Sequence, residues 1–411
     1  MHINTSASGG AGIAARRMQE ALLAQGVQAG FLSKTLTLGF KGEQLSDPFF
    51  KYNKPSFISR LKNKLGWHRK KQLQFEQLLQ AIEPAIKAEI ITSPESDFDL
   101  LQHPLVQQAD IIHLHWVNGI LDYPSFFKAI DKPVFWTLHD MNPFLGLYHY
   151  REDETRNSGK SAHELNESFK VIKKDAYQQL KALHLVSPSQ WLIEQAKASG
   201  IFPIDTKYSV LANGLDLEMY SDPKDNDFLK QEEPLKLIYV SDRLENPRKG
   251  ADLLRDALSQ LSIPVRLVTM GAGSMQVNNP LLDVQSLGFI EDESEKVKAI
   301  SQAAALLLPS REDNLPNTML EALAAGTPVL GFKIGGLAEH ITDGFNGLLA
   351  KELSATALAS VIEQFHKQKQ DFESTKIKAY AQEHFDANNQ AKKLVNRYLE
   401  PRNNPQKPQT P

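Results

Sequence analysis

Short apolar runs alternate with longer amphipathic stretches along this chain of 411 residues. This alternation is typical of parallel strands joined by helical crossovers. The predicted strands of the first half are Met1–Asn4, Gln28–Ser33, Asp110–His115, Pro133–Leu138, Leu183–Ser187 and Tyr208–Ala212. Those of the second half are Leu235–Val240, Val265–Met270, Val284–Phe289, Ala305–Pro309 and Pro328–Phe332. The pattern predicts an α/β fold with two doubly wound, Rossmann-like domains.

A polar stretch without an apolar period, Asp216–Pro234, suits a connection between two domains. We therefore predict an N-terminal domain over residues 1–215 and a C-terminal domain over 216–379. The last helical pattern is Thr375–Leu399, and we expect its residues from about 380 to 399 to pack back on the first domain. The proline-rich residues 400–411 predict a disordered tail. The first strand is short, and a translation start upstream of Met1 would lengthen it.

Composition and charge narrow the classes of function. The chain has no cysteine, which excludes disulfides, thiolate zinc sites and cysteine nucleophiles. A net charge of -3 gives no general attraction to nucleic acid, so we expect no nucleic-acid partner. No apolar run has the length of a signal peptide or a membrane span, which predicts a cytoplasmic protein.

One local charge cluster points to a membrane surface. The segment Lys51–Lys71 holds eight lysines and arginines and no acid, interleaved with apolar residues. Such a basic amphipathic element predicts peripheral contact with the anionic inner face of the cytoplasmic membrane. The alternative is a solvated helix face.

Open α/β sheets bind ligands beyond the carboxyl ends of their strands. After the first strand, Gly10 and Gly12 precede the helical stretch Ile13–Leu23, so their amides are candidates for phosphate contact. The alternative is a tight turn packed on the sheet. The segment also matches G-x-G-x-x-A, but the next strand ends in Ser33 and Lys34 rather than an acid, which disfavours a dehydrogenase.

Histidines follow two of the predicted strands. His139 comes directly after Pro133–Leu138 and beside Asp140, which places an ionisable pair at the carboxyl end of a strand. We interpret His139 as an active-site candidate. His113 and His115 share one face of their strand, and we interpret them as hydrogen-bonded structural residues.

The second half carries a cationic cluster and an acidic motif. Arg248 and Lys249 precede the helix Ala251–Leu261, with Arg243 in the preceding loop, and such cations suit a diphosphate leaving group. The alternative is a solvated helix start. Further on, Asp313 ends a loop after a buried strand, Asn317 and Thr318 are candidates for a helix cap, and Glu321 lies one turn inside that helix. Acids at this spacing reach hydroxyls of two different sugars, which predicts a nucleotide-sugar site.

Taken together, these motifs resemble the retaining glycosyltransferases of family 4, and more narrowly bacterial surface-polysaccharide members related to colanic acid transferases. The resemblance covers nearly the whole chain. Its signatures are Ile3–Ser6 with Gly9 and Gly10, Ile112–Trp116, Trp136–Met141, Val186–Ser189, Asn213–Asp216, Pro247–Gly250, Asp313–Glu321, and Gly335–Gly336 with Asn346–Gly347. It implies the GT-B fold, in which two Rossmann-like domains face each other across a cleft.

The resemblance also implies roles for individual residues. Asp313 would lie near the donor sugar and Glu321 on the ribose, Lys249 would bind the diphosphate, and His139 would lie near the transferred sugar. The implied catalytic residues are His139, Asp313 and Lys249. The implied donor-binding residues are Gly10, Gly12, Arg243, Arg248, Lys249, Gly288, Phe289, Asn314, Leu315, Asn317, Thr318 and Glu321.

The implied reaction is transfer of a sugar, with retention, from a UDP- or GDP-sugar to a glycan or lipid-linked glycan in surface polysaccharide synthesis. No metal and no other cofactor is expected, because protein cations stabilise the leaving group; the D-x-D of Asp97 and Asp99 is interpreted as incidental. Two features depart from the family: Asp313 stands where Glu is usual, and Asn142–Ser161 lacks the cysteine-bearing loop of many relatives. Alternatives are a sugar-nucleotide epimerase and an inactive glycan-binding relative.

Overall fold

The computed structural model describes residues 1–35, 43–44, 70–82, 86–220, 229 and 234–400. The chain divides into two compact units, one made of residues 1–211 with those from 390 onward and the other of residues 212–389. The boundary expected after residue 215 thus falls after residue 211, and the return expected near residue 380 begins at 390. Within the described residues, no helix has the length and apolar character needed to span a membrane.

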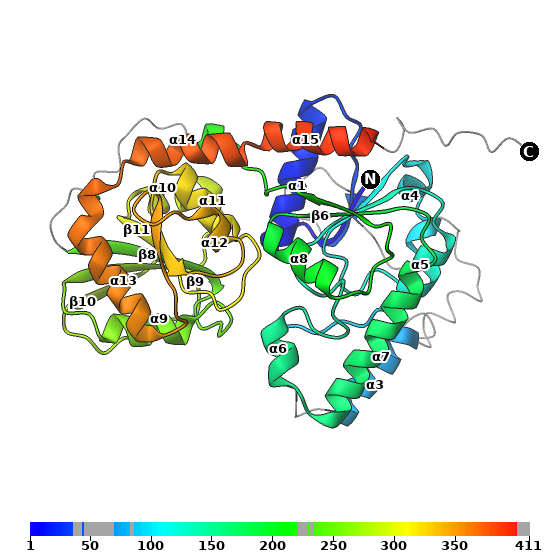
Figure 1. The fold of residues 1–411 in the computed structure, drawn as a ribbon, viewed down its shortest axis with the longest axis horizontal. Coiled ribbons are helices and arrows are strands. Elements are labelled where there is room, and N and C mark those ends of the chain that lie inside the picture. The colour runs from blue at the N-terminus through cyan, green and yellow to red at the C-terminus, as the bar shows by residue number, and fades with distance from the viewer. Residues whose placement is uncertain (36–42, 45–69, 83–85, 221–228, 230–233, 401–411) are drawn as a thin grey trace, which may run out of the picture. The chain divides into compact units, whose positions relative to one another are not determined.

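The first unit contains a parallel sheet of seven strands (Figure 1). Its spatial order is β3-β2-β1-β4-β5-β6-β7. The strands are β1 (His2–Ser6), β2 (Phe31–Thr35), β3 (Glu43–Gln44), β4 (Ile112–Leu114), β5 (Val134–Thr137), β6 (Leu183–Ser187) and β7 (Lys207–Val210). The order reverses between β1 and β4, which is the point where doubly wound sheets place their ligands.

The second unit contains a parallel sheet of six strands, in the order β10-β9-β8-β11-β12-β13. These are β8 (Leu235–Arg243), β9 (Val265–Ala272), β10 (Leu282–Ser286), β11 (Ala305–Leu308), β12 (Val329–Phe332) and β13 (Gly347–Ala350). Its order reverses between β8 and β11. The predicted α/β class with two doubly wound sheets is confirmed, while β3 and β13 were not predicted.

Helices cover both sheets, as buried parallel strands require. In the first unit they are α1 (Gly9–Ala24), α3 (Lys70–Ile82), α4 (Pro104–Gln108), α5 (Tyr123–Ala129), α6 (Arg151–Arg156), α7 (Lys160–Tyr177) and α8 (Gln190–Ala198). In the second they are α9 (Ala251–Ser259), α10 (Glu293–Ser301), α11 (Asn317–Ala324), α12 (Leu337–His340), α13 (Ala355–Gln368) and α14 (Ser374–Phe385). Helix α13 packs beside α9, and α11 packs beside α14 (Figure 1).

The last helical pattern is two helices rather than one. Helix α15 (Ala387–Leu399) is separated from α14 by Asp386, whose backbone is extended (φ -58°, ψ 122°). The break has two physical causes. Leu215 bonds to the backbone of Phe385 and Ala387 at 2.7 and 2.9 Å, and the Asp386 carboxylate accepts the Asn389 amide at 2.7 Å. The unit boundary runs through α15, so its residues from Gln390 onward belong to the first unit.

Candidate active site

In the second unit, the loops after β8 and β11 meet where the strand order reverses. Lys249 follows β8 and Asp313 follows β11, and the Lys249 Nζ lies 2.5 Å from the Asp313 Oδ2. Arg248 Nη1 lies 3.8 Å from the same oxygen and donates to the Glu312 carbonyl at 3.0 Å. The structure therefore brings together predicted residues that are 64 positions apart in the chain.

The charges in this cluster are tightly coupled. Burial by itself raises the pKa of the Asp313 carboxyl, but Lys249 and Arg248 outweigh it and hold the pKa below its ordinary value. Asp313 is therefore ionised at neutral pH and compensates the two cations. A phosphate group arriving at the same place would offer Lys249 and Arg248 a second anionic partner.

Arg311 holds the cationic loop in place, and sequence reasoning missed it. Its guanidinium binds the Asp252 carboxylate in a bidentate manner at 2.6 and 2.7 Å and also donates to the Pro247 carbonyl at 2.6 Å. Its amide donates to the Arg248 carbonyl at 2.8 Å. Arg311 thus ties residues 247 and 248 to the segment that follows β11. Its position two residues before Asp313 was the available signal.

A second ion pair lies inside the helix that follows. The Glu321 side chain on α11 is 3% exposed, and its Oε2 lies 2.5 Å from the Nζ of Lys296 on α10. Lys296 was not predicted, because one lysine on an amphipathic helix resembles a solvated position. The pair shows that Glu321 is a buried carboxylate with its own cation, not an exposed surface acid.

The segment between these two acids is fixed by its backbone. Asn314 and Leu315 are buried, the Asn314 carbonyl accepts the Gly336 amide at 2.6 Å, and the Asn213 side chain donates to the Asn317 Oδ1 at 3.1 Å. The helix cap expected from Asn317 and Thr318 is wrong. Pro316 occupies the cap position, and both residues are already the first two of α11.

Three predicted donor residues of this unit lie neither in the ion-pair cluster nor in the segment from Asp313 to Glu321. Arg243 is the last residue of β8, which continues past Val240 through an irregularity, and it forms no ion pair with another described residue. Gly288 and Phe289 follow β10 rather than ending it, because the strand stops at Ser286. Phe289 is 62% exposed, so its ring is accessible to a planar ligand.

In the first unit, the side chains of His139 and Asp140 form hydrogen bonds with different residues rather than with each other. His139 Nε2 lies 3.2 Å from His115 Nδ1. The Asp140 carboxylate lies 2.6 Å from His149 Nδ1 and accepts the Trp116 indole N–H at 2.8 Å. Burial lowers the pKa of His139 to about 4, so this imidazole is neutral at pH 7.

Gly10 and Gly12 lie inside a helix rather than in a loop, because α1 already begins at Gly9. A Cβ at Gly12 would lie 2.7 Å from the carbonyl carbon of Ala7, which is closer than real side chains approach. Glycine at this position therefore lets the first turn of α1 pack onto the end of β1. The alternative of close packing thus has a geometric basis, and phosphate contact stays a prediction.

A buried lysine supports the segment that follows His139. Lys173 on α7 is fully buried, and its Nζ donates to the carbonyls of Asn142, Leu145 and Gly146 at 2.5, 2.8 and 2.8 Å. These hydrogen bonds fix the start of Asn142–Ser161, the stretch that lacks the cysteine-bearing loop expected from the family resemblance. The periodicity of α7 did not distinguish Lys173 from its solvated neighbours.

The two acids of the D-x-D sequence, Asp97 and Asp99, were interpreted as incidental to the chemistry. Asp97 accepts the amides of Lys71 and Gln72 at the start of α3, and Asp99 accepts the Leu101 amide at 3.2 Å. Both acids therefore act as helix caps.

Most of the basic segment Lys51–Lys71 lies outside the described residues, as does the tail from residue 401.

Residues 234–368 match the family model described as "Glycosyl transferases group 1". The chain is 27% identical over 316 residues to a glycogen synthase of Marinomonas sp. (strain MWYL1), covering 64% of each chain. It is 24% identical over 248 residues to the putative colanic acid biosynthesis glycosyl transferase WcaC of Escherichia coli (strain K12), covering 55% of this chain and 59% of that one. The chain therefore spans less than two thirds of the length of either relative.

Among solved structures, that of Anabaena HepE in complex with UDP and glucose is similar to this chain. The TM-score is 0.61 at 17% identity, over 97% of this chain and 98% of that one. This likeness establishes the GT-B fold. The family match adds that residues 234–368, in the second unit, are similar to the group 1 glycosyltransferases.

Proposed function

We propose that this protein is a glycosyltransferase that takes a sugar from a nucleotide diphosphate donor. The observation that carries the proposal is the ion-pair cluster of Lys249, Arg248 and Asp313 at the switch point of the second sheet. The cluster lies within the residues that match the group 1 glycosyltransferase model. It places two cations beyond the carboxyl ends of β8 and β11, where open sheets bind ligands.

The leaving group gains negative charge as the bond to the sugar breaks, and a preorganised cation stabilises that charge. Lys249 and Arg248 are held by Asp313 and by the Arg311 clamp before any ligand arrives, so little reorganisation is needed. In this proposal Glu321 accepts hydrogen bonds from the ribose hydroxyls, and Asp313 lies near the donor sugar. Because HepE was solved with UDP and glucose, a UDP-sugar is the first donor to test.

The finer assignments are also proposals. Retention at the anomeric carbon and independence from metal rest on the resemblance to family 4, supported by the cationic cluster. The role in surface polysaccharide synthesis, with a glycan or lipid-linked glycan as acceptor, is supported by the similarity to the E. coli colanic acid protein. A cytoplasmic location on the inner membrane face rests on the charge of Lys51–Lys71.

The test is release of nucleoside diphosphate from UDP-, GDP- and ADP-sugars, with and without bacterial membrane extract. We expect release that depends on the extract, and a loss of about 100-fold or more in Lys249→Ala and Glu321→Ala. Lys298→Ala is the matched control, because Lys298 is an exposed lysine of the same unit without an ion pair to a described residue. Chelation of divalent metals should leave release unchanged.

Other outcomes would contradict the proposal in distinct ways. Conversion of the donor without any dependence on the extract would indicate an epimerase or a hydrolase. Nucleotide binding without turnover of any donor would indicate an inactive glycan-binding relative. Full activity of Lys249→Ala would refute the assignment of the diphosphate site.

A further inference from the structure

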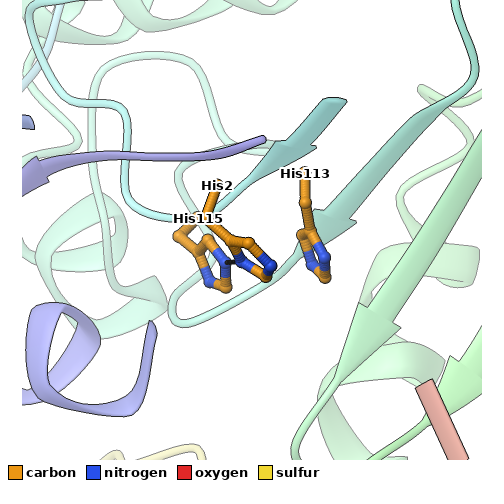
Figure 2. Close-up of side chains that lie close together, drawn as sticks. All are labelled: His2, His113 and His115. Atoms are coloured by element: carbon orange, nitrogen blue, oxygen red, sulfur yellow. Dashed lines mark hydrogen bonds between the residues drawn. The ribbon is translucent and has the colours of Figure 1, made fainter. Parts of the chain in front are cut away.

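A row of aromatic rings crosses one face of the first sheet. The register of β1 against β4 places His2 beside His113, and that of β5 places Phe135 beside His113 on the other side. His2 and His113 stack with ring centroids 4.9 Å apart, and His113 and His115 stack at 4.5 Å (Figure 2). Tyr398 of α15 covers this row with its edge toward His113.

Three imidazoles of this region form a continuous hydrogen-bonded chain. His2 Nδ1 lies 2.9 Å from His115 Nε2, the contact drawn as a dashed line in Figure 2. His115 Nδ1 lies 3.2 Å from His139 Nε2. Both ring nitrogens of His115 are therefore engaged, one toward each neighbour.

The hydrogen-bonded row of His2, His115 and His139 leads from the interior of the unit to a more accessible end. His2 and His115 are 2% and 4% exposed, whereas His139 is only partly buried. The Nδ1 of His139 forms no hydrogen bond with any residue that the structure describes. This nitrogen is therefore the one with which His139 can meet a ligand.

The arrangement of His2, His113 and His115 is explained less well by a bound metal ion than by hydrogen bonds. One nitrogen from each of His2, His113 and His115 lies within 4.8 Å of the others. A tetrahedral zinc site needs ligand nitrogens about 3.3 Å apart on rings that converge on one point. The rings of His113 and His115 are instead nearly parallel, at 10°, and His113 already bonds to Thr137 at 2.7 Å and to Tyr398.

We propose that His115, anchored by His2, is a positioning residue that fixes the ring orientation and tautomer of His139. A neutral imidazole has one N–H, so each hydrogen bond in the chain determines which nitrogen of the next ring carries the proton. Burial lowers the pKa of His2 and His115 well below the ordinary value, which keeps both rings neutral. For either direction of these hydrogen bonds, the tautomer of His115 thus sets whether His139 Nδ1 carries the proton.

The role of His139 in transfer rests on the proposed function, but the tautomer can be measured without substrate. The experiment is a long-range 15N–1H NMR spectrum of the full chain labelled on histidine nitrogens, with His139 assigned by His139→Gln. We expect one tautomer of His139 in the wild type. In His115→Phe, which keeps a stacking ring but no hydrogen bond, we expect two tautomers and at least a tenfold fall in kcat with an unchanged KM for the donor.

Two conservative variants separate positioning from packing. His115→Asn keeps an amide near the Nδ1 position that can hydrogen-bond to His139 Nε2, so His139 should stay in one tautomer rather than two. His115→Gln places its amide near the Nε2 position, keeps the bond to His2, and should behave like His115→Phe. His184→Phe is the control for loss of a buried, stacked ring in the same sheet. His184 hydrogen-bonds to Ser209 and to none of His2, His115 and His139.

A His139 spectrum that is the same in the wild type, His115→Phe and His115→Gln would overturn the proposal. Stoichiometric zinc in the purified protein, lost in His2→Phe, would overturn it in favour of a metal site. If the wild type turns over no donor, the proposed function fails while the spectra still decide the inference. If His115→Phe does not fold, His115→Gln provides the same comparison.

Discussion

Gly250 offers a direct test of how the cationic loop that carries Arg248 and Lys249 is held. It follows Lys249, occupies the cap position directly before α9 with a left-handed backbone (φ 72°), and lies against Pro309, which directly follows β11. An added Cβ would lie 2.7 Å from the Pro309 carbonyl carbon and closer still to its oxygen. Gly250→Ala therefore strains the backbone and forces the two loops apart.

The expected cost has two parts. A left-handed alanine costs about 1–2 kcal/mol, and an overpacked contact adds about 1–3 kcal/mol. Gly250→Ala should thus lower the free energy of unfolding by about 2–5 kcal/mol in total. Gly344 is the matched control in the same unit, since it has φ 78° and nothing within 4 Å of the added Cβ.

Urea unfolding followed by circular dichroism measures both variants. Gly344→Ala should show only the backbone cost of about 1–2 kcal/mol. Displacement of Lys249 by about 1 Å should also lower donor turnover about 100-fold in Gly250→Ala and not in Gly344→Ala. Equal losses of stability in the two variants, or undiminished turnover in Gly250→Ala, would refute the close approach of the two loops.

Two further predictions concern pH and the buried carboxylate. Burial lowers the pKa of His139 and of His184 to about 4, so the unfolded chain takes up protons below pH 6.5 that the folded chain does not. The free energy of unfolding should therefore fall by about 2 kcal/mol for each of these two histidines as the pH drops from 7 to 5. A urea midpoint that does not change over this range would contradict the burial of the two rings. Lys296→Met leaves Glu321 without its cation and should cost about 3 kcal/mol and raise the KM for the donor, whereas Lys298→Met on the same helix should do neither.

Strand positions could be predicted because buried parallel strands are continuous apolar runs, as in Ala305–Leu308 and Val329–Phe332. The edge strand Gly347–Ala350 was missed because its only strongly apolar residues are Leu348 and Leu349, between a glycine and an alanine, which is too short an apolar run to indicate a strand. The start of α1 was placed too late because Gly9–Gly12 looks like a loop in sequence. Helix propensity is overridden there by packing of the first turn onto β1.

The pairs that build the candidate site could be predicted only in part. Lys249 and Asp313 were each singled out from local sequence, but their contact depends on β8 and β11 being neighbours in the sheet. His2 gave no signal at all, because a histidine after the first methionine has no pattern around it. Its place beside His113 arises from strand register, which local sequence does not specify.

The split of α15 between the units has a consequence for the order of folding during synthesis. Residues 212–389 are contiguous, so the second unit is complete once residue 389 has left the ribosome. The first unit still lacks Tyr398, which covers the histidine row on its sheet. The half of the protein that is translated first is therefore the half that finishes folding last, and its histidine face stays open until the end of α15 emerges.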